Sequence, residues 1–181
     1  MHTDINSTAS TLARNAHTLG WVSRLLAVLL PVLLSVSWFV GTAKLELLRN
    51  LGLDTSLQLE PMQILGAFLL SLLPVLALAR ALFNIATCFD CFVKTDWFGS
   101  MQPLALAKAG RWLVVSGLLV LSVPTLLGLI VTFNASIGER ALVISLSSNG
   151  ALSILFGVLL SSFGQLWAKA NALASENARF V

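Results

Sequence analysis

Four long apolar stretches constrain the fold of this chain more than any other feature of its sequence. Each holds roughly 18–22 mostly apolar residues, about the number that an α-helix needs to cross a hydrocarbon core about 30 Å thick. In lipid the backbone polar groups must bond within the chain, and four segments cannot close a barrel. We therefore predict an all-α integral membrane protein whose four transmembrane helices form an antiparallel bundle. The predicted spans are 21–43, 62–83, 112–133 and 150–167.

The composition also favours a lipid environment. Of the 181 residues, 57% are hydrophobic and only 10% are charged, whereas a soluble domain carries about 25% charged residues. Too few polar side chains are available to cover a soluble globule. The net charge of +3 suits anionic lipid and does not suggest nucleic acid. We therefore expect the lipid bilayer as a partner and no direct nucleic acid binding.

The segments outside the spans predict a single membrane domain over residues 21–181, preceded by a cytoplasmic tail at 1–20 with a helical turn or two after Ser10. Residues 84–111 are the predicted cytoplasmic connection. The predicted external loops are 44–61 and 134–149. The long region before the first span favours an uncleaved helix over a signal peptide.

The two external loops carry patterns of their own. The first begins with closely spaced leucines, which predict a short amphipathic helix on the membrane surface. Residues 55–60 and 141–147 alternate apolar and polar side chains, a period typical of strands. A small two-stranded external cap is therefore predicted.

The basic residues predict an orientation. With both termini inside, eight of the eleven Lys and Arg residues are cytoplasmic and three are external, which the positive-inside rule favours. Three tryptophans then fall at the inner boundary, a depth that indole rings prefer. The cytoplasmic set is Arg14, Arg24, Arg80, Lys94, Lys108, Arg111, Lys169 and Arg179, and the external set is Lys44, Arg49 and Arg140.

Two cysteines in the cytoplasmic connection have the spacing of a redox or metal half-site. Cys88 and Cys91 lack the βαβ context of a thioredoxin-like motif and the further ligands of a zinc site. We interpret them as small, semi-buried residues on a second helix that continues to about Val93, with Asp90 and Lys94 paired four residues apart. The sequence predicts no catalytic, cofactor-binding or metal site, and no enzyme.

An aromatic pair in the same connection is the best candidate for contact with a cytoplasmic protein. Asp96, Trp97, Phe98 and Lys108 place aromatic rings beside charges, a combination common at binding surfaces. The alternative is that Trp97 and Phe98 anchor the turn to the membrane surface, and the sequence does not separate the two.

Small residues recur every four positions along the fourth span. Small side chains at this spacing let two helices approach closely, and a glutamine can hydrogen-bond across the contact. This is the predicted packing face within the chain, and homo-oligomerisation is the alternative. Its members are Ser153, Gly157, Ser161, Gly164 and Gln165.

Two further function classes remain open. A small transporter or channel subunit would need a water-lined path, for which the candidates are Ser35, Ser71, Ser116, Ser122, Thr125, Ser161 and Gln165. A redox protein would use the two cysteines. Only Arg80 places a charge within the second span, near its inner end, where a long side chain reaches the interface. A proton relay is therefore disfavoured.

Several short elements resemble a bacterial four-helix membrane family called domain of unknown function 2975. Phe98-Gly99-Ser100 precedes Leu106 and Gly110, and the chain closes on a Glu-Asn tail at 174–181. The strand-like segment before the fourth span is also similar, and the resemblance covers most of residues 20–181. Thr95 stands where we expect the family's glycine, which predicts a different turn.

The resemblance implies a place in the bacterial inner membrane but no established activity. Some family members resemble proteins whose genes lie beside those of small helix-turn-helix regulators. This resemblance implies a regulatory membrane partner. The sequence thus favours a non-enzymatic interaction or regulatory protein of the inner membrane, multi-pass, with both termini cytoplasmic.

Overall fold

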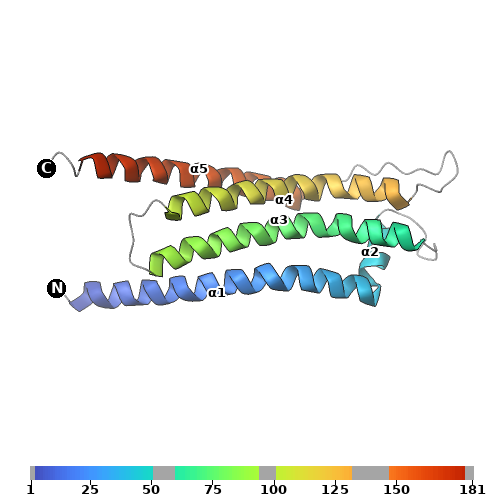
Figure 1. The fold of residues 1–181 in the computed structure, drawn as a ribbon, viewed down its shortest axis with the longest axis horizontal. Coiled ribbons are helices and arrows are strands. Elements are labelled where there is room, and N and C mark those ends of the chain that lie inside the picture. The colour runs from blue at the N-terminus through green and yellow to red at the C-terminus, as the bar shows by residue number, and fades with distance from the viewer. Residues whose placement is uncertain (1–2, 51–59, 94–100, 132–146, 178–181) are drawn as a thin grey trace.

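The computed structural model describes residues 3–50, 60–93, 101–131 and 147–177. All regular structure in these ranges is helical, and no strand occurs in them. The helices are α1 (Thr3–Val40), α2 (Thr42–Asn50), α3 (Pro61–Val93), α4 (Met101–Val131) and α5 (Ser148–Asn177). Figure 1 shows the four long helices side by side, with both termini at the same end. We call this end the terminal end.

The prediction of four membrane-length helices is confirmed. Helices α1, α3, α4 and α5 each contain a stretch long and apolar enough to cross a membrane. They have 38, 33, 31 and 30 residues. At 1.5 Å per residue each is about 45 Å or longer, which exceeds a hydrocarbon core of about 30 Å. All four helices therefore have length to spare beyond a membrane.

Helix packing follows the order of the chain. Extensive contacts join α1 to α3, α3 to α4 and α4 to α5, and a smaller contact joins α1 to the short α2. No other pair of described helices packs extensively. Figure 1 shows the same order as a row, from α1 through α3 and α4 to α5. These contacts do not establish the predicted bundle, which would also bring the first and last helices together.

At the end of the molecule opposite the terminal end, a turn at Gly41 and two hydrogen bonds of Gln63 position the helix ends. Gly41, at a φ of 86°, lets the chain turn from α1 into α2 in a conformation that other residues disfavour. The side-chain Oε1 of Gln63 accepts a hydrogen bond from the Glu60 N–H at 3.0 Å, which caps the start of α3. Its Nε2 donates to the Ile130 carbonyl at 3.4 Å. The start of α3 is thus tied to the end of α4.

Several predicted boundaries change. The predicted tail at 1–20 is helical from Thr3, because α1 continues through the polar segment without a break. The second helix does extend to Val93, as predicted, and the short helix predicted within residues 44–61 is found as α2. Nearly all of the two strand-like segments lies outside the described residues, and the cap is not seen.

Candidate functional site

Glycines bring α4 and α5 into backbone contact. A Cβ atom on Gly157 would lie 2.7 Å from both the Gly110 carbonyl oxygen and the Val114 nitrogen. A Cβ on Gly164 would lie 2.6 Å from the Ala107 nitrogen. Real Cβ atoms do not approach backbone atoms so closely, and such close approach is typical of small-residue interfaces between membrane helices.

The structure places the predicted small-residue face of the fourth span against α4. Gly157, Ser161 and Gly164 are buried, Ser153 is half-buried and Gln165 is exposed. The Nε2 of Gln165 donates to the Ser161 hydroxyl at 3.3 Å, so the glutamine bonds within its own helix rather than across the contact.

Sequence reasoning missed the opposing half of this interface. Gly110 and Gly117 on α4 face glycines on α5, and a Cβ on Gly117 would lie 2.8 Å from the Gly150 carbonyl oxygen. The α5 glycines recur at positions 150, 157 and 164, and two of the three α4 glycines stand at 110 and 117. This shared seven-residue spacing on two neighbouring spans is the signal that would have identified the contact.

An ion pair joins α1 to α3 near the terminal end. The Arg24 guanidinium contacts the Asp90 carboxylate, and the two side chains are 41% and 35% exposed. Gly20 lies one turn before Arg24, and a Cβ there would be 3.5 Å from the Phe89 Cβ. This close helix contact directs Asp90 to α1, where Arg24 is its partner. Lys94, the predicted partner, lies outside the described residues.

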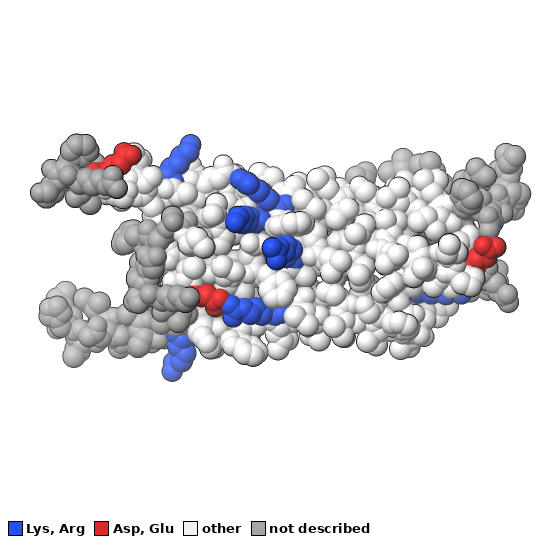
Figure 2. Space-filling view, viewed as in Figure 1, with Lys and Arg blue, Asp and Glu red and all other residues white. Residues whose placement is uncertain are grey.

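Basic side chains gather in a band across the long helices. The Ser116 hydroxyl donates to the Pro74 carbonyl at 2.9 Å, which shows that these two residues lie at the same level of α4 and α3. Because the two helices run in opposite directions, six residues nearer the terminal end Arg80 lies level with Gly110. Lys108 and Arg111 flank that level. Figure 2 shows the resulting band of blue side chains over the terminal half, with little red beside it. We call Arg24, Arg80, Lys108 and Arg111 the basic band.

Two surface grooves meet this band. One, of about 650 Å³, lies along α1 and is lined by Trp21, Arg24, Leu25, Val28, Leu29, Val32 and Phe83. The other, of about 330 Å³, lies between α4 and α5 and is more polar; its lining is Arg111, Val114, Val158, Ser161, Ser162 and Gln165. The groove along α1 thus places a basic residue beside an apolar surface, and the α4–α5 groove places one beside a more polar surface.

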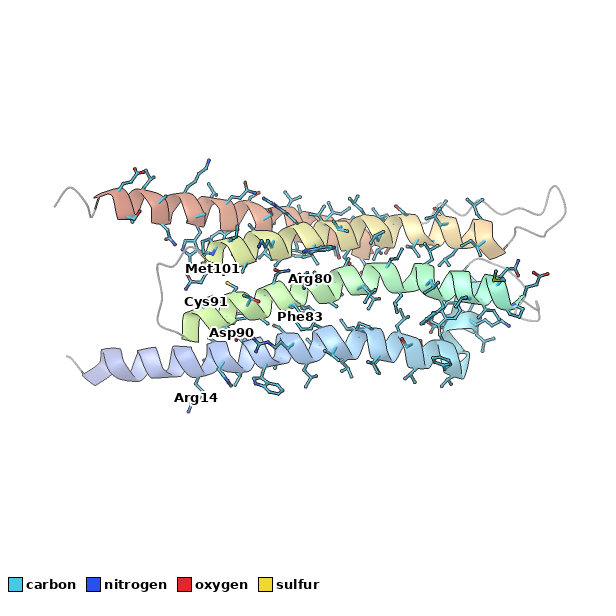
Figure 3. All side chains as sticks on the ribbon, viewed as in Figure 1. Arg14, Arg80, Phe83, Asp90, Cys91 and Met101 are labelled. Atoms are coloured by element: carbon cyan, nitrogen blue, oxygen red, sulfur yellow. The ribbon has the colours of Figure 1, made fainter. Side chains whose placement is uncertain are left out.

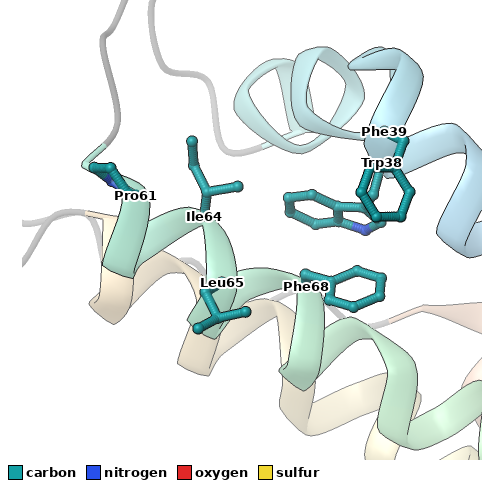
Figure 4. Close-up of a pocket in the computed structure, with 6 residues that line it drawn as sticks. All are labelled: Trp38, Phe39, Pro61, Ile64, Leu65 and Phe68. Carbon is teal, nitrogen blue, oxygen red and sulfur yellow. The ribbon is translucent and has the colours of Figure 1, made fainter.

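A third groove, at the end away from the termini, is apolar throughout. It measures about 400 Å³ and is lined by Trp38, Phe39, Pro61, Ile64, Leu65 and Phe68. Figure 4 shows the Trp38 and Phe68 rings facing each other, in an edge-to-face arrangement with centroids 6.0 Å apart. This lining offers hydrophobic packing but no group for acid–base or metal chemistry.

The two cysteines lie near the end of α3, where Figure 3 labels Cys91 close to Asp90 and Met101. Cys88 is buried and Cys91 is half-buried, and both are free thiols. Within the described residues no group of three or more His, Cys, Asp or Glu could hold a metal. The two thiols therefore differ in their exposure to solvent.

We therefore expect the two thiols to react at different rates. A maleimide added to detergent-solubilised protein should modify Cys91 first, because Cys88 is 5% exposed and thiols buried in apolar surroundings are inert. Mass spectrometry of Cys88→Ser and Cys91→Ser variants would measure each rate, with denatured protein as the control. Equal rates in the folded protein would contradict the placement of Cys88.

The remaining predicted site residues are described only in part. Asp96, Trp97 and Phe98 lie outside the described residues, and Lys108 is exposed on α4. Of the polar residues considered for a water-lined path, Ser35, Ser71 and Ser122 donate to carbonyls of their own helices. Ser161 and Gln165 share the α4–α5 groove.

No protein-family model, curated protein or solved structure matches this chain. The family resemblance therefore stays a prediction.

Proposed function

We propose that this chain is a multi-pass protein of the bacterial inner membrane with a non-enzymatic interaction or regulatory role. In this proposal the four long helices cross the bilayer as an antiparallel bundle with both termini cytoplasmic. The resemblance to the family of unknown function 2975 supports the bacterial host and the regulatory role. The basic band then lies at the inner boundary of the membrane, as the positive-inside rule favours.

One observation carries the interaction role. All four long helices continue past the basic band at the terminal end. Helix α3 runs about 20 Å beyond Arg80 to Val93, and α4 begins about 15 Å before Arg111 at Met101. Helix α1 and α5 also extend there. A membrane anchor would not need this extra helical length, whereas a cytoplasmic partner would find a helical surface on it.

The segment that joins Val93 to Met101 contains the proposed partner contact, Asp96, Trp97 and Phe98. Replacing both aromatic residues with alanine should abolish capture of a soluble partner from a cytoplasmic extract while membrane insertion is unchanged. Large aromatic anchors dominate the energy of many interfaces. Affinity purification after cross-linking in intact cells would measure the loss.

A matched aromatic pair provides the control. Trp38 and Phe39 stand next to each other on α1 at the opposite end of the molecule. Alanine at these two positions should leave partner capture intact. Unchanged capture by the Trp97→Ala, Phe98→Ala variant would show that this pair does not contact the partner. Loss of insertion in that variant would instead support a membrane-surface anchor.

A small transporter or channel subunit is the alternative function. The α4–α5 groove favours it, since Arg111, Ser162 and Gln165 place a cation beside hydroxyl and amide groups. Selective uptake of a small anion by proteoliposomes, lost in Arg111→Gln, would support this alternative over a purely interacting role.

A further inference from the structure

The groove along α1 has the elongated shape of a site for one extended hydrocarbon chain. Its α1 residues Trp21, Leu25, Val28 and Val32 follow one another at three- and four-residue intervals, so they form one stripe along the helix surface. The stripe is about 16 Å long, at 1.5 Å per residue. Phe83 of α3 closes one side of the groove.

Positive charge lies at the terminal end of this groove. Arg24 is part of its lining, and its ion pair with Asp90 leaves the side chain 41% exposed. A guanidinium has five N–H donors, more than one carboxylate occupies. Arg80 precedes Phe83 by three residues and is exposed, so it lies on the same surface of α3. Figure 3 labels Arg80 and Phe83 close together.

Arg80 differs from Arg24 in its surroundings. The Arg24–Asp90 contact is the one ion pair within the described residues, and Arg80 has no acidic partner among them. Within the part of the chain that the structure describes, the charge of Arg80 is therefore not balanced by a carboxylate. The groove thus combines an apolar channel with one arginine near its terminal end and a second, Arg80, beside its middle, which suits an amphiphile with an anionic head.

We propose that this groove binds an acidic glycerophospholipid of the inner leaflet. One acyl chain lies along α1 against Phe83, and the phosphate lies near Arg24 and Arg80. In a membrane-inserted chain with cytoplasmic termini, the charged end of the groove faces the headgroups and its apolar end faces the bilayer centre. Trp21 is then at headgroup depth, where indole rings prefer to lie. This inference rests on the proposed insertion and orientation.

Quenching of Trp21 fluorescence by brominated lipids tests the site. A variant that keeps Trp21 and carries Phe at the other four tryptophans would be placed in phosphatidylcholine vesicles. Phosphatidylglycerol and phosphatidylcholine with brominated acyl chains are then compared at equal mole fraction. We expect about fivefold tighter association of the acidic lipid, because a basic residue at an anionic surface contributes about that factor.

The substitution Arg80→Gln should remove most of this preference while it leaves the Arg24–Asp90 ion pair in place. Arg24→Gln should also weaken it. The control Lys44→Gln, on α2 at the other end of the molecule, should keep the preference. For a variant that does not fold, native mass spectrometry of the wild-type chain with each lipid would give the same comparison.

Each outcome decides the proposal. Equal quenching of Trp21 by both lipids, or a preference that survives Arg80→Gln and Arg24→Gln, would overturn the acidic-lipid site while insertion stands. A second variant that keeps only Trp38 separates the other failure. If brominated lipids quench neither Trp21 nor Trp38, the chain is not in the bilayer, and the proposed function fails together with the site.

Discussion

Gly157→Ala is expected to destabilise the protein by about 1–3 kcal/mol, the usual cost of overpacking a tight contact. Elsewhere in a helix the same change stabilises by about 0.5–1 kcal/mol, since glycine has greater backbone freedom to lose. At Gly157 the new methyl would meet the backbone of Gly110 and Val114 at 2.7 Å. Two backbones cannot yield as a flexible side chain can, and α4 and α5 must therefore separate.

Gly66→Ala is the matched control. A Cβ on Gly66 would meet only the Ile130 side chain, at 3.9 Å, which is an ordinary van der Waals distance. This variant should be slightly more stable than the parent protein, so the two substitutions should have opposite signs. Reversible unfolding in mixed micelles, followed by circular dichroism, would measure both free energies.

The same experiment separates the two interpretations of the small-residue face. If Gly157 packs within the chain, the stability loss should not depend on protein concentration. If it packs between chains, the loss should grow as the protein is diluted, and the variant should shift to a smaller assembly in light scattering. A Gly157→Ala protein as stable as Gly66→Ala would mean that the close approach of α4 and α5 does not form.

The sequence predicted the helices well because their cause is local. Long apolar runs must satisfy their backbone within each segment, even where Pro31, Pro74 and Pro124 stand inside the helix, so the number of helices follows from hydropathy alone. The helical extension to Val93 followed from apolar periodicity beyond the span. The N-terminal residues were missed because they lack that periodicity. Gly20 lies against α3, where a Cβ added to it would be 3.5 Å from the Phe89 Cβ. Such tertiary packing overrides weak local preference.

The candidate site was less predictable because it depends on contacts between distant residues. Arg24 and Asp90 are 66 positions apart, whereas Lys94 is a plausible neighbour of Asp90 within one helix. Only the register of α1 against α3 shows that Arg24 reaches Asp90. The same holds for Arg80: the sequence shows a snorkelling residue near a span end, but not that it shares a face with the groove along α1.

The second large effect is on orientation. In the proposed orientation, replacing all four residues of the basic band with glutamine would leave four basic residues on the cytoplasmic side against three outside. The positive-inside rule depends on this difference near the span ends. We therefore expect the fixed orientation to become a mixture of two topologies. A C-terminal fusion to a reporter that is active only outside the membrane, paired with one that is active only inside, would measure the fraction of each.

Removing the charges that are external in the proposed orientation is the matched control for this prediction. Glutamine at Lys44, Arg49 and Arg140 changes nearly as many charges but increases the bias toward cytoplasmic termini. This variant should keep the parental orientation. If the variant without the basic band also keeps it, the remaining basic residues or helix packing determine the topology, and the band's main role is then to contact lipid headgroups. Restoring Lys108 and Arg111 alone should return most molecules to the parental orientation if charge near the third span decides it.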